Sequence, residues 1–248
     1  MQENWARHTR EVNMVKSPAI PPDPGSLSPA VMAGLIDHTL LKPEAVAARF
    51  EELCDEAARY RFATVCVNPA WVRFCAERLQ GSGIGLCSVV GFPLGNIMPE
   101  DKAAEARRAV GNGATEIDMV LHVGWLKSGF ASLVLEDIAR VVEASAPHAV
   151  KVILETCLLT EEEKIAACEL ARSAGAHFVK TSTGFGKGGA TVEDIALMRR
   201  CVGEALGVKA SGGIRDLPTA LAMIAAGANR IGTSSGVTII EEIKQLNS

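Results

Sequence analysis

The sequence lacks a long apolar run that could cross a membrane as a helix. Its longest uncharged stretch extends from Gln80 to Pro99, about the length of a membrane span, but contains five glycines and two prolines. Glycine and proline at this density indicate a strand followed by a loop. We therefore predict no transmembrane segment and no membrane partner.

An excess of basic residues is also missing. The 248 residues carry a net charge of −4 at pH 7, with an isoelectric point near 5.8. Such a balance gives no overall attraction for nucleic acid or anionic membrane. We expect no nucleic-acid partner, and any phosphate group must be held by local groups.

The sequence contains neither a cluster of potential metal ligands nor a CxxC pair of cysteines. The five histidines lack ligand-like spacing, so no metal is expected. The cysteines are odd in number and form no CxxC pair, which is typical of reduced thiols in the cytoplasm. They are Cys54, Cys66, Cys75, Cys87, Cys157, Cys168 and Cys201.

The first thirty residues differ from the rest of the chain. They lack the apolar core of a signal peptide, and the stretch SPAIPPDPGSLSP is typical of a linker. We therefore expect an N-terminal arm over 1–30 and one catalytic domain over 31–248.

From residue 31 onward, short β-branched runs alternate with helical patterns. Typical helical segments are 44–60 and 160–176, the second with Thr160 and Glu163 spaced as a capping box. The expected strands are 35–41, 63–69, 84–93, 116–123, 150–156, 178–183, 208–213 and 229–234. Eight such units with apolar strands favour a single α/β domain, a parallel (β/α)8 TIM barrel, over a doubly wound open sheet.

Four of the charged residues in these apolar strands stand out, namely Asp37, Asp118, Lys180 and Lys209. In a (β/α)8 barrel the chemistry takes place where the strands end, so polar residues late in strands are candidates for catalysis. A single such lysine could instead pair with a carboxylate or extend to solvent. Two lysines on consecutive strands, each followed by small residues and glycine, favour a functional role.

The two lysines suggest a chemistry based on a neutral amine. Burial and a neighbouring cation both lower the pKa of a lysine, so one of the pair can be a free amine. A free amine attacks an aldehyde or ketone and forms an iminium, which is class I aldolase chemistry. Asp118, on a strand adjacent to neither, could face them across the barrel and move protons. The spacing alone does not decide which lysine is the nucleophile.

A phosphate site is expected near the last two strands, where barrels often bind this group. The segments SGG at 211–213 and TSSG at 233–236 offer small residues with accessible amides, although they could be ordinary turns and caps. The candidate substrate-binding residues are Asp37, Cys66, Thr183, Gly184, Lys187, Gly212, Gly213, Ser234 and Ser235. For Cys66, an inert buried thiol is an equally good interpretation.

Two other functions compete with this one. Residues 184–189, GFGKGG, match the GxGxxG pattern of dinucleotide-binding proteins, with Glu204 about twenty residues on. An NAD-dependent oxidoreductase would leave Lys180 and Lys209 unexplained, and the match lies in the sixth βα unit. A non-catalytic phosphate-binding barrel would be attractive only if Lys180 or Asp118 were missing.

Several stretches together resemble the deoxyribose-phosphate aldolase family. They include LIDHTLLKPEA, EIDMVLHVG, FVKTSTGFGKGGAT and VKASGGIR, and the likeness covers residues 35–240. The resemblance implies that Lys180 forms the Schiff base, that Lys209 tunes its protonation and that Asp118 joins a proton relay. It further implies reversible cleavage of 2-deoxy-D-ribose 5-phosphate to glyceraldehyde 3-phosphate and acetaldehyde without a cofactor. The outer helices could support a homodimer.

Overall fold

The structure is a computed structural model that describes residues 27–246. Eight parallel strands pair in sequence order, and β1 closes the sheet by pairing with β8. The strands are β1 (Ile36–Leu40), β2 (Thr64–Val67), β3 (Gly85–Val90), β4 (Glu116–Val120), β5 (Ala149–Ile153), β6 (Phe178–Lys180), β7 (Gly207–Ser211) and β8 (Arg230–Thr233). The predicted (β/α)8 barrel is confirmed, and the alternative of an open sheet is wrong.

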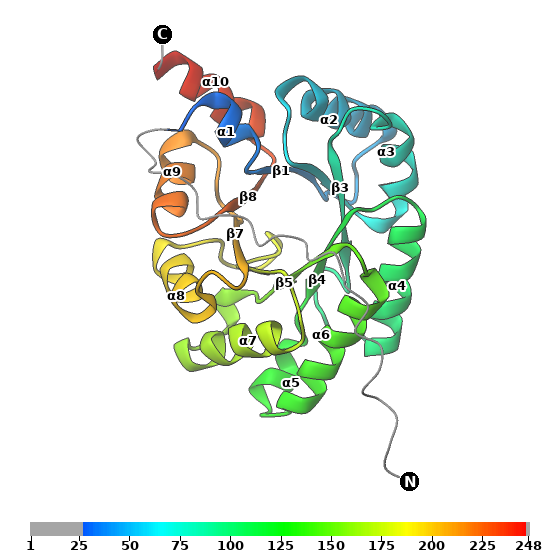
Figure 1. Ribbon diagram of the computed structural model, residues 1–248, viewed down its shortest axis with the longest axis vertical. Helices are drawn as coiled ribbons and strands as arrows, with labels where there is room; N and C mark the ends of the chain where they lie inside the picture. The colour runs from blue at the N-terminus through cyan, green and yellow to red at the C-terminus, as the bar shows by residue number, and fades with distance from the viewer. Residues whose placement is uncertain (1–26, 247–248) are drawn as a thin grey trace.

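Helices follow the strands and surround them, as Figure 1 shows. The helices are α1 (Pro29–Ala33), α2 (Ala47–Tyr60), α3 (Val72–Arg78), α4 (Pro99–Gly111), α5 (Val123–Lys127), α6 (Ala131–Ser145), α7 (Glu161–Ser173), α8 (Val192–Val202), α9 (Leu217–Ala225) and α10 (Gly236–Leu246). Short 3-10 helices follow two strands, η2 (Pro69–Trp71) after β2 and η3 (Thr156–Leu158) after β5. The capping box predicted at Thr160 and Glu163 is confirmed at the start of α7.

Helix α1 crosses the boundary expected between the arm and the barrel. Ser28 caps the helix by accepting a hydrogen bond from the amide of Val31, and Met32 and Ala33 are buried. The helix packs beside α10 (Figure 1). Residues 1–26, most of the expected arm, lie outside the described residues, so the arm itself stays a prediction.

The strands end earlier than the sequence predicts. Strand β6 stops at Lys180 rather than residue 183, and β3 stops at Val90 rather than residue 93. The reason is that the chain leaves the ladder where glycines and polar residues begin the loops. Gly91 and Gly184 both have positive φ, which a pleated strand does not allow. These loops form the face of the barrel at the carboxyl ends of the strands.

The apolar core has two unequal parts. The larger cluster contains most of the buried residues from the strands and surrounding helices, such as Ile117, Ile138 and Ile195. A separate small cluster is formed by Leu41, Cys66, Cys87 and Val89. The interior of the barrel therefore has few apolar side chains, and charged ones occupy much of the remaining space.

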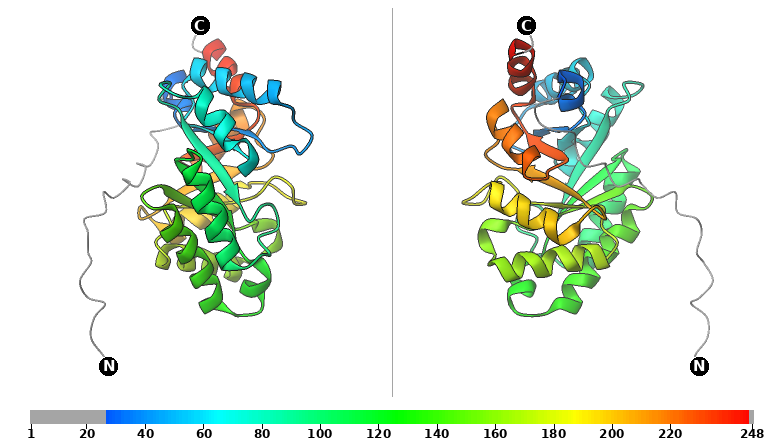
Figure 2. Two further views of the ribbon diagram at one scale, coloured as in Figure 1. Left: turned by 90° about the vertical axis from the view of Figure 1, so that its right-hand side faces the viewer. Right: turned by 60° about the vertical axis from the view of Figure 1, so that its left-hand side comes forward.

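None of the helices within residues 27–246 is both long and apolar enough to span a membrane. In the left view of Figure 2, the loop after β1 (blue) and the loop after β6 (yellow) extend from the same side of the barrel. Both loops contribute residues to one cavity.

Candidate active site

Lys180 and Lys209 occupy paired positions on β6 and β7. Each side chain points inward, and each ammonium nitrogen lies 2.8 Å from Oδ2 of Asp118 on β4. Lys209 and Asp118 are fully buried, whereas Lys180 keeps 3% of its surface exposed. The structure thus brings together the three residues to which the sequence assigned catalysis.

Six charged side chains inside the barrel form a closed circuit, which we name the charge ring. Its members are, in order of contact, Asp37, Arg230, Glu116, Lys151, Asp118 and Lys209. The six successive N···O distances are 2.6, 3.0, 2.5, 2.8, 2.8 and 2.5 Å. Every acid lies between two bases, so the three acids and three bases neutralise one another.

The ring keeps its members charged in spite of their burial. Burial raises the pKa of Asp37, but Arg230, Lys209 and Lys151 outweigh it and hold that pKa far below its usual value. Burial acts against the charge of Lys209 as well, yet Asp118 and Asp37 raise the pKa of its amine. Lys209 is therefore a fixed cation and not the free amine.

Lys180 stands outside the ring. Of the ion pairs within residues 27–246 it takes part in one, with the Asp118 oxygen that Lys209 also contacts. Because the ring is already neutral, a proton on Lys180 adds an uncompensated charge to a buried space, which is unfavourable. The three acids of the ring are thus balanced without Lys180.

Two thiols lie against the ring. Cys87 Sγ is 3.1 Å from Oδ1 of Asp118 and 3.5 Å from the amine of Lys151, and Cys66 occupies the position beside Cys87 in the ladder. The two sulfurs and an Asp118 oxygen lie within 4.8 Å of one another, as metal ligands would. However, Asp118 already contacts the ring cations Lys151 and Lys209, and these repel a further cation from this position.

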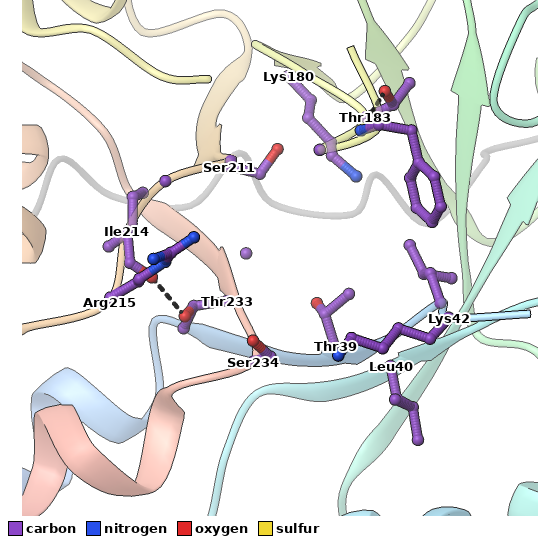
Figure 3. A pocket seen from close by; sticks show the side chains of 16 residues that line it. Thr39, Leu40, Lys42, Lys180, Thr183, Ser211, Ile214, Arg215, Thr233 and Ser234 are labelled. Atoms are coloured by element: carbon purple, nitrogen blue, oxygen red, sulfur yellow. Dashed lines mark hydrogen bonds between the residues drawn. The ribbon is translucent and has the colours of Figure 1, made fainter. Parts of the chain in front are cut away.

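A cavity of about 380 Å³ opens above these residues at the carboxyl ends of the strands. Figure 3 shows Lys180 directed into it from one side, with Ser234 and Thr39 on the opposite side. Five of the predicted substrate-binding residues line it: Thr183, Gly184, Gly212, Gly213 and Ser234. Gly212 and Gly213 both have positive φ, near +88° and +83°, so this turn requires glycine.

The other predicted substrate-binding residues lie elsewhere. Asp37 and Cys66 are fully buried below the cavity. Lys187 is exposed and is not among the residues that line it. Ser235 lines a neighbouring cavity of about 300 Å³, together with His38 and Glu56. Of the two successive serines after β8, Ser234 lines both cavities, whereas Ser235 lines the neighbouring one.

Two cations at the cavity were missed by the sequence analysis. Arg215 follows the SGG segment, and Lys42 follows β1; both are exposed and line the cavity (Figure 3). Their signal was available, since each comes within a few residues of the end of a predicted strand. The cavity therefore combines a buried amine with two exposed positive charges.

Glu155, just after β5, is a further residue that the sequence analysis missed. Its backbone has φ near +54°, a conformation that is unfavourable for a residue with a side chain. Its buried carboxylate accepts a 3.3 Å hydrogen bond from the Thr183 amide and another from the Thr183 hydroxyl. That hydroxyl in turn accepts one from the amide of Phe185. Glu155 thus holds the β6–α8 loop against the cavity.

The GFGKGG segment does not form a dinucleotide-binding turn. In that motif the last glycine packs at the opening of a helix whose N-terminus faces the pyrophosphate. Here α8 begins only at Val192, with Thr191 as its cap. A closed barrel also lacks the switch point of an open sheet, where dinucleotides bind. The oxidoreductase alternative has no structural support.

A closed parallel barrel with a buried lysine at the base of a polar cavity defines a (β/α)8 enzyme that is equipped for carbonyl chemistry. The model of the DeoC/LacD family of aldolases matches residues 31–242, and the chain belongs to this family. Its members are class I aldolases.

Similar proteins agree with this assignment. The chain is 61% identical to the deoxyribose-phosphate aldolase of Brevibacillus brevis over 213 residues, which cover 86% of this chain and 96% of the relative. It is 59% identical to that of a Geobacillus strain over 211 residues, or 85% and 95% of the two chains. A solved structure of the enzyme from Aeropyrum pernix, described as a unique tetramer, matches with a TM-score of 0.83 and 36% identity, covering 88% and 93%.

Proposed function

We propose that this protein is a deoxyribose-phosphate aldolase, which reversibly cleaves 2-deoxy-D-ribose 5-phosphate to D-glyceraldehyde 3-phosphate and acetaldehyde. The observation that carries the proposal is the position of Lys180, at the base of the cavity and outside a neutral charge ring. The roles of individual residues below belong to the same proposal.

The first stage is formation of an iminium on Lys180. The neutral amine attacks C1 of the open-chain sugar, and the resulting carbinolamine loses water. Asp118, whose carboxylate is 2.8 Å from the nitrogen, is placed to accept and return protons there. Lys209, fixed as a cation 2.8 Å from the same oxygen, stabilises the carboxylate and repels a proton from Lys180.

The second stage breaks the bond between C2 and C3. A base removes the proton of the C3 hydroxyl, a carbonyl forms at C3, and the bonding electrons move to the iminium to give an enamine. Glyceraldehyde 3-phosphate leaves, the enamine is protonated at C2, and water releases acetaldehyde and the Lys180 amine. Atoms and electrons balance without any redox partner.

We place the phosphate group at the wall formed by Gly212, Gly213 and Ser234. Small residues at this turn allow an anion to approach the backbone closely. Arg215 and Lys42 add positive charge at the rim of the same cavity. Ser234 lies across the cavity from Lys180, as expected if the two ends of one substrate are held apart (Figure 3).

Trapping with acetaldehyde and borohydride tests the nucleophile. Reduction of the iminium adds an ethyl group to one lysine, which peptide mass mapping locates. We expect the adduct on Lys180 in the parent protein and no adduct in Lys180→Met. An adduct on Lys209 in the parent, or a requirement for a divalent ion, would overturn the proposal.

A pair of adjacent variants tests the phosphate position. Ser234→Asp puts a negative charge into the cavity, so we expect a large rise in KM for the phosphorylated sugar and little change for unphosphorylated deoxyribose. Ser235→Asp is the matched control, because Ser235 lines the neighbouring cavity. Equal effects of both variants, or equal losses with both sugars, would place the phosphate elsewhere.

We further propose a cytoplasmic, homo-oligomeric enzyme. The seven cysteines within the described residues are free thiols, which fits a reducing compartment. A homodimer remains our prediction, and mass photometry of the purified protein would distinguish it from a monomer or a tetramer.

A further inference from the structure

We propose that the lower half of the charge ring, Glu116, Lys151 and Arg230, sets the protonation state of Lys180 although none of these residues lines the cavity. They act through Asp118 and through the net charge of the barrel interior, so they are positioning residues. The inference rests on the proposed function, because it concerns the reactivity of the same amine.

The three residues connect directly to the carboxylate that contacts Lys180. Lys151 lies 2.8 Å from Oδ1 of Asp118, which leaves Oδ2 to Lys180 and Lys209. Glu116 bridges Lys151, at 2.5 Å, and Arg230, at 3.0 Å. Removal of any one member therefore changes the charge that Asp118 and its neighbours present to the amine.

Water is largely kept from this part of the barrel. The side chain of Lys151 is fully buried, and those of Arg230 and Glu116 are only 13% and 17% exposed. The ring of Phe178 packs below the cations, with its centroid 5.4 Å from the Arg230 guanidinium and 5.9 Å from the Lys151 amine. Charge interactions are weakly screened in such surroundings, so they extend beyond direct contacts.

Opposite changes of charge in the lower half of the ring must shift the pH at which the Lys180 amine loses its proton in opposite directions. With Glu116 neutralised, the interior holds an excess of positive charge even when Lys180 is neutral, so the amine loses its proton at lower pH. With Arg230 neutralised, the acids outnumber the ring bases, and a proton on Lys180 restores the balance. The amine then keeps its proton to higher pH.

The size of the effect follows from the geometry of the sheet. Arg230 pairs with Lys209, and Lys209 pairs with Lys180, so Arg230 lies two strands away, about 10 Å. At an effective dielectric constant of about 20, a unit charge at that distance shifts a titration by about one pH unit, a tenfold change in the reactive fraction.

Other charged and titratable groups also face Lys180 and are left unchanged by these variants. They are Asp37 on β1, Cys66 on β2, Cys87 on β3, Asp118 on β4, Glu155 after β5, Lys209 on β7, and the rim residues Lys42 and Arg215. Any shift seen on changing Glu116 or Arg230 is therefore due to the lower half of the ring.

The test is the pH dependence of single-turnover trapping of acetaldehyde on Lys180, from about pH 5 to 9. We expect the midpoint of the profile to fall by about one unit in Glu116→Gln and to rise by about one unit in Arg230→Met. Below the midpoint, trapping should then become about tenfold faster or slower, respectively. Arg230→Lys, which keeps the charge, should restore the midpoint of the parent.

The control is Lys102→Met, which removes a fully buried cation between α4 and α6, outside the barrel interior. It should leave the midpoint unchanged. Midpoints that stay at the parent value in both ring variants, or move in the same direction, would overturn the inference. If Arg230→Met does not fold, the isosteric Glu116→Gln decides by itself. Failure of the parent to trap acetaldehyde on Lys180 would instead reject the proposed function.

Discussion

Buried charge occurs in two regions of this molecule, and the two behave in opposite ways. Between α4 and α6, Lys102 and Asp137 form an isolated pair 2.5 Å apart, both fully buried. Burial raises the pKa of Asp137 and lowers that of Lys102, so each group tends toward its neutral form. In the charge ring the directions are reversed: the pKa of Asp118 is lowered and that of Lys151 is raised.

The difference lies in the number of partners rather than in the degree of burial. Asp118 has Lys151 on one oxygen and two amines on the other. One oxygen of Asp137 lacks a hydrogen-bond partner among the described residues, and its only cation is shared with the carbonyl of Val120. A buried charge is therefore kept where opposite charges alternate around it, and Lys180 falls outside this alternation.

The largest effect on activity is expected for a substitution of Lys180. We expect Lys180→Met to reduce cleavage by about 10³-fold or more, because it removes the buried amine beside Asp118, and the Lys42 amine lies at the exposed rim of the cavity. Its stability should stay close to that of the parent, since the neutral ring remains. Activity assays and urea unfolding check the two parts, and a large loss of stability would mean that Lys180 belongs to the ring.

The reverse result is expected for the isolated pair. Lys102→Met leaves the Asp137 carboxyl buried without its cation, so the free energy of unfolding should fall by about 3 kcal/mol. The kcat of the folded fraction should be unchanged, because neither residue reaches the cavity. Urea unfolding and titration of active sites measure these quantities. A loss of kcat comparable to the Lys180 variant would contradict the separation of the two regions.

The two regions should also differ in how pH affects stability. The pKa of Asp37 is lowered by folding, so near pH 4 the unfolded chain binds more protons and stability rises with pH. The pKa of Asp137 is raised, so its contribution falls as pH rises through the same range. Asp37→Asn should therefore flatten the rise below about pH 5, where the unfolded carboxyl still takes up protons, and Asp137→Asn should remove the opposing slope above about pH 4. Urea unfolding across this range tests both, and equal slopes would contradict the assignment.

The smallest effect is expected for charge on the surface. Arg78 contacts Asp55 at 2.9 Å between α3 and α2, and both side chains are exposed. We expect Arg78→Gln to leave both activity and the urea midpoint within experimental error, because solvent and salt screen such pairs. A clear loss of stability here would weaken the distinction between alternating buried charge and ordinary pairs.

The fold could be predicted because the same strand pattern occurs eight times along the chain. Each of the eight strands combines an apolar run with a nearby break, and Lys180 and Lys209 were visible as charges within such runs. The same signal was present at Lys151, in VKVILET, but that lysine was not followed by glycine and was not considered. Its importance arises from contacts with Asp118 and Glu116, which depend on barrel closure.

The sequence alone could not predict which way individual side chains point. Ser234 and Ser235 are chemically equivalent neighbours just before α10, yet Ser234 lines the cavity that holds Lys180 and Ser235 does not. Similarly, nothing in the local pattern distinguishes Lys180 from Lys209. Asp37, which is 172 residues away in the chain, makes Lys209 part of the ring.

The ion pair between Asp37 and Arg230 crosses the seam where the last strand meets the first, and it joins residues 193 positions apart. During synthesis on a ribosome, the amine of residue 180 therefore emerges well before the guanidinium that completes its surroundings. In a nascent chain that ends before residue 230 the sheet cannot close between β8 and β1, so the charge ring is incomplete. The buried surroundings of Lys180 thus arise only with the final strand.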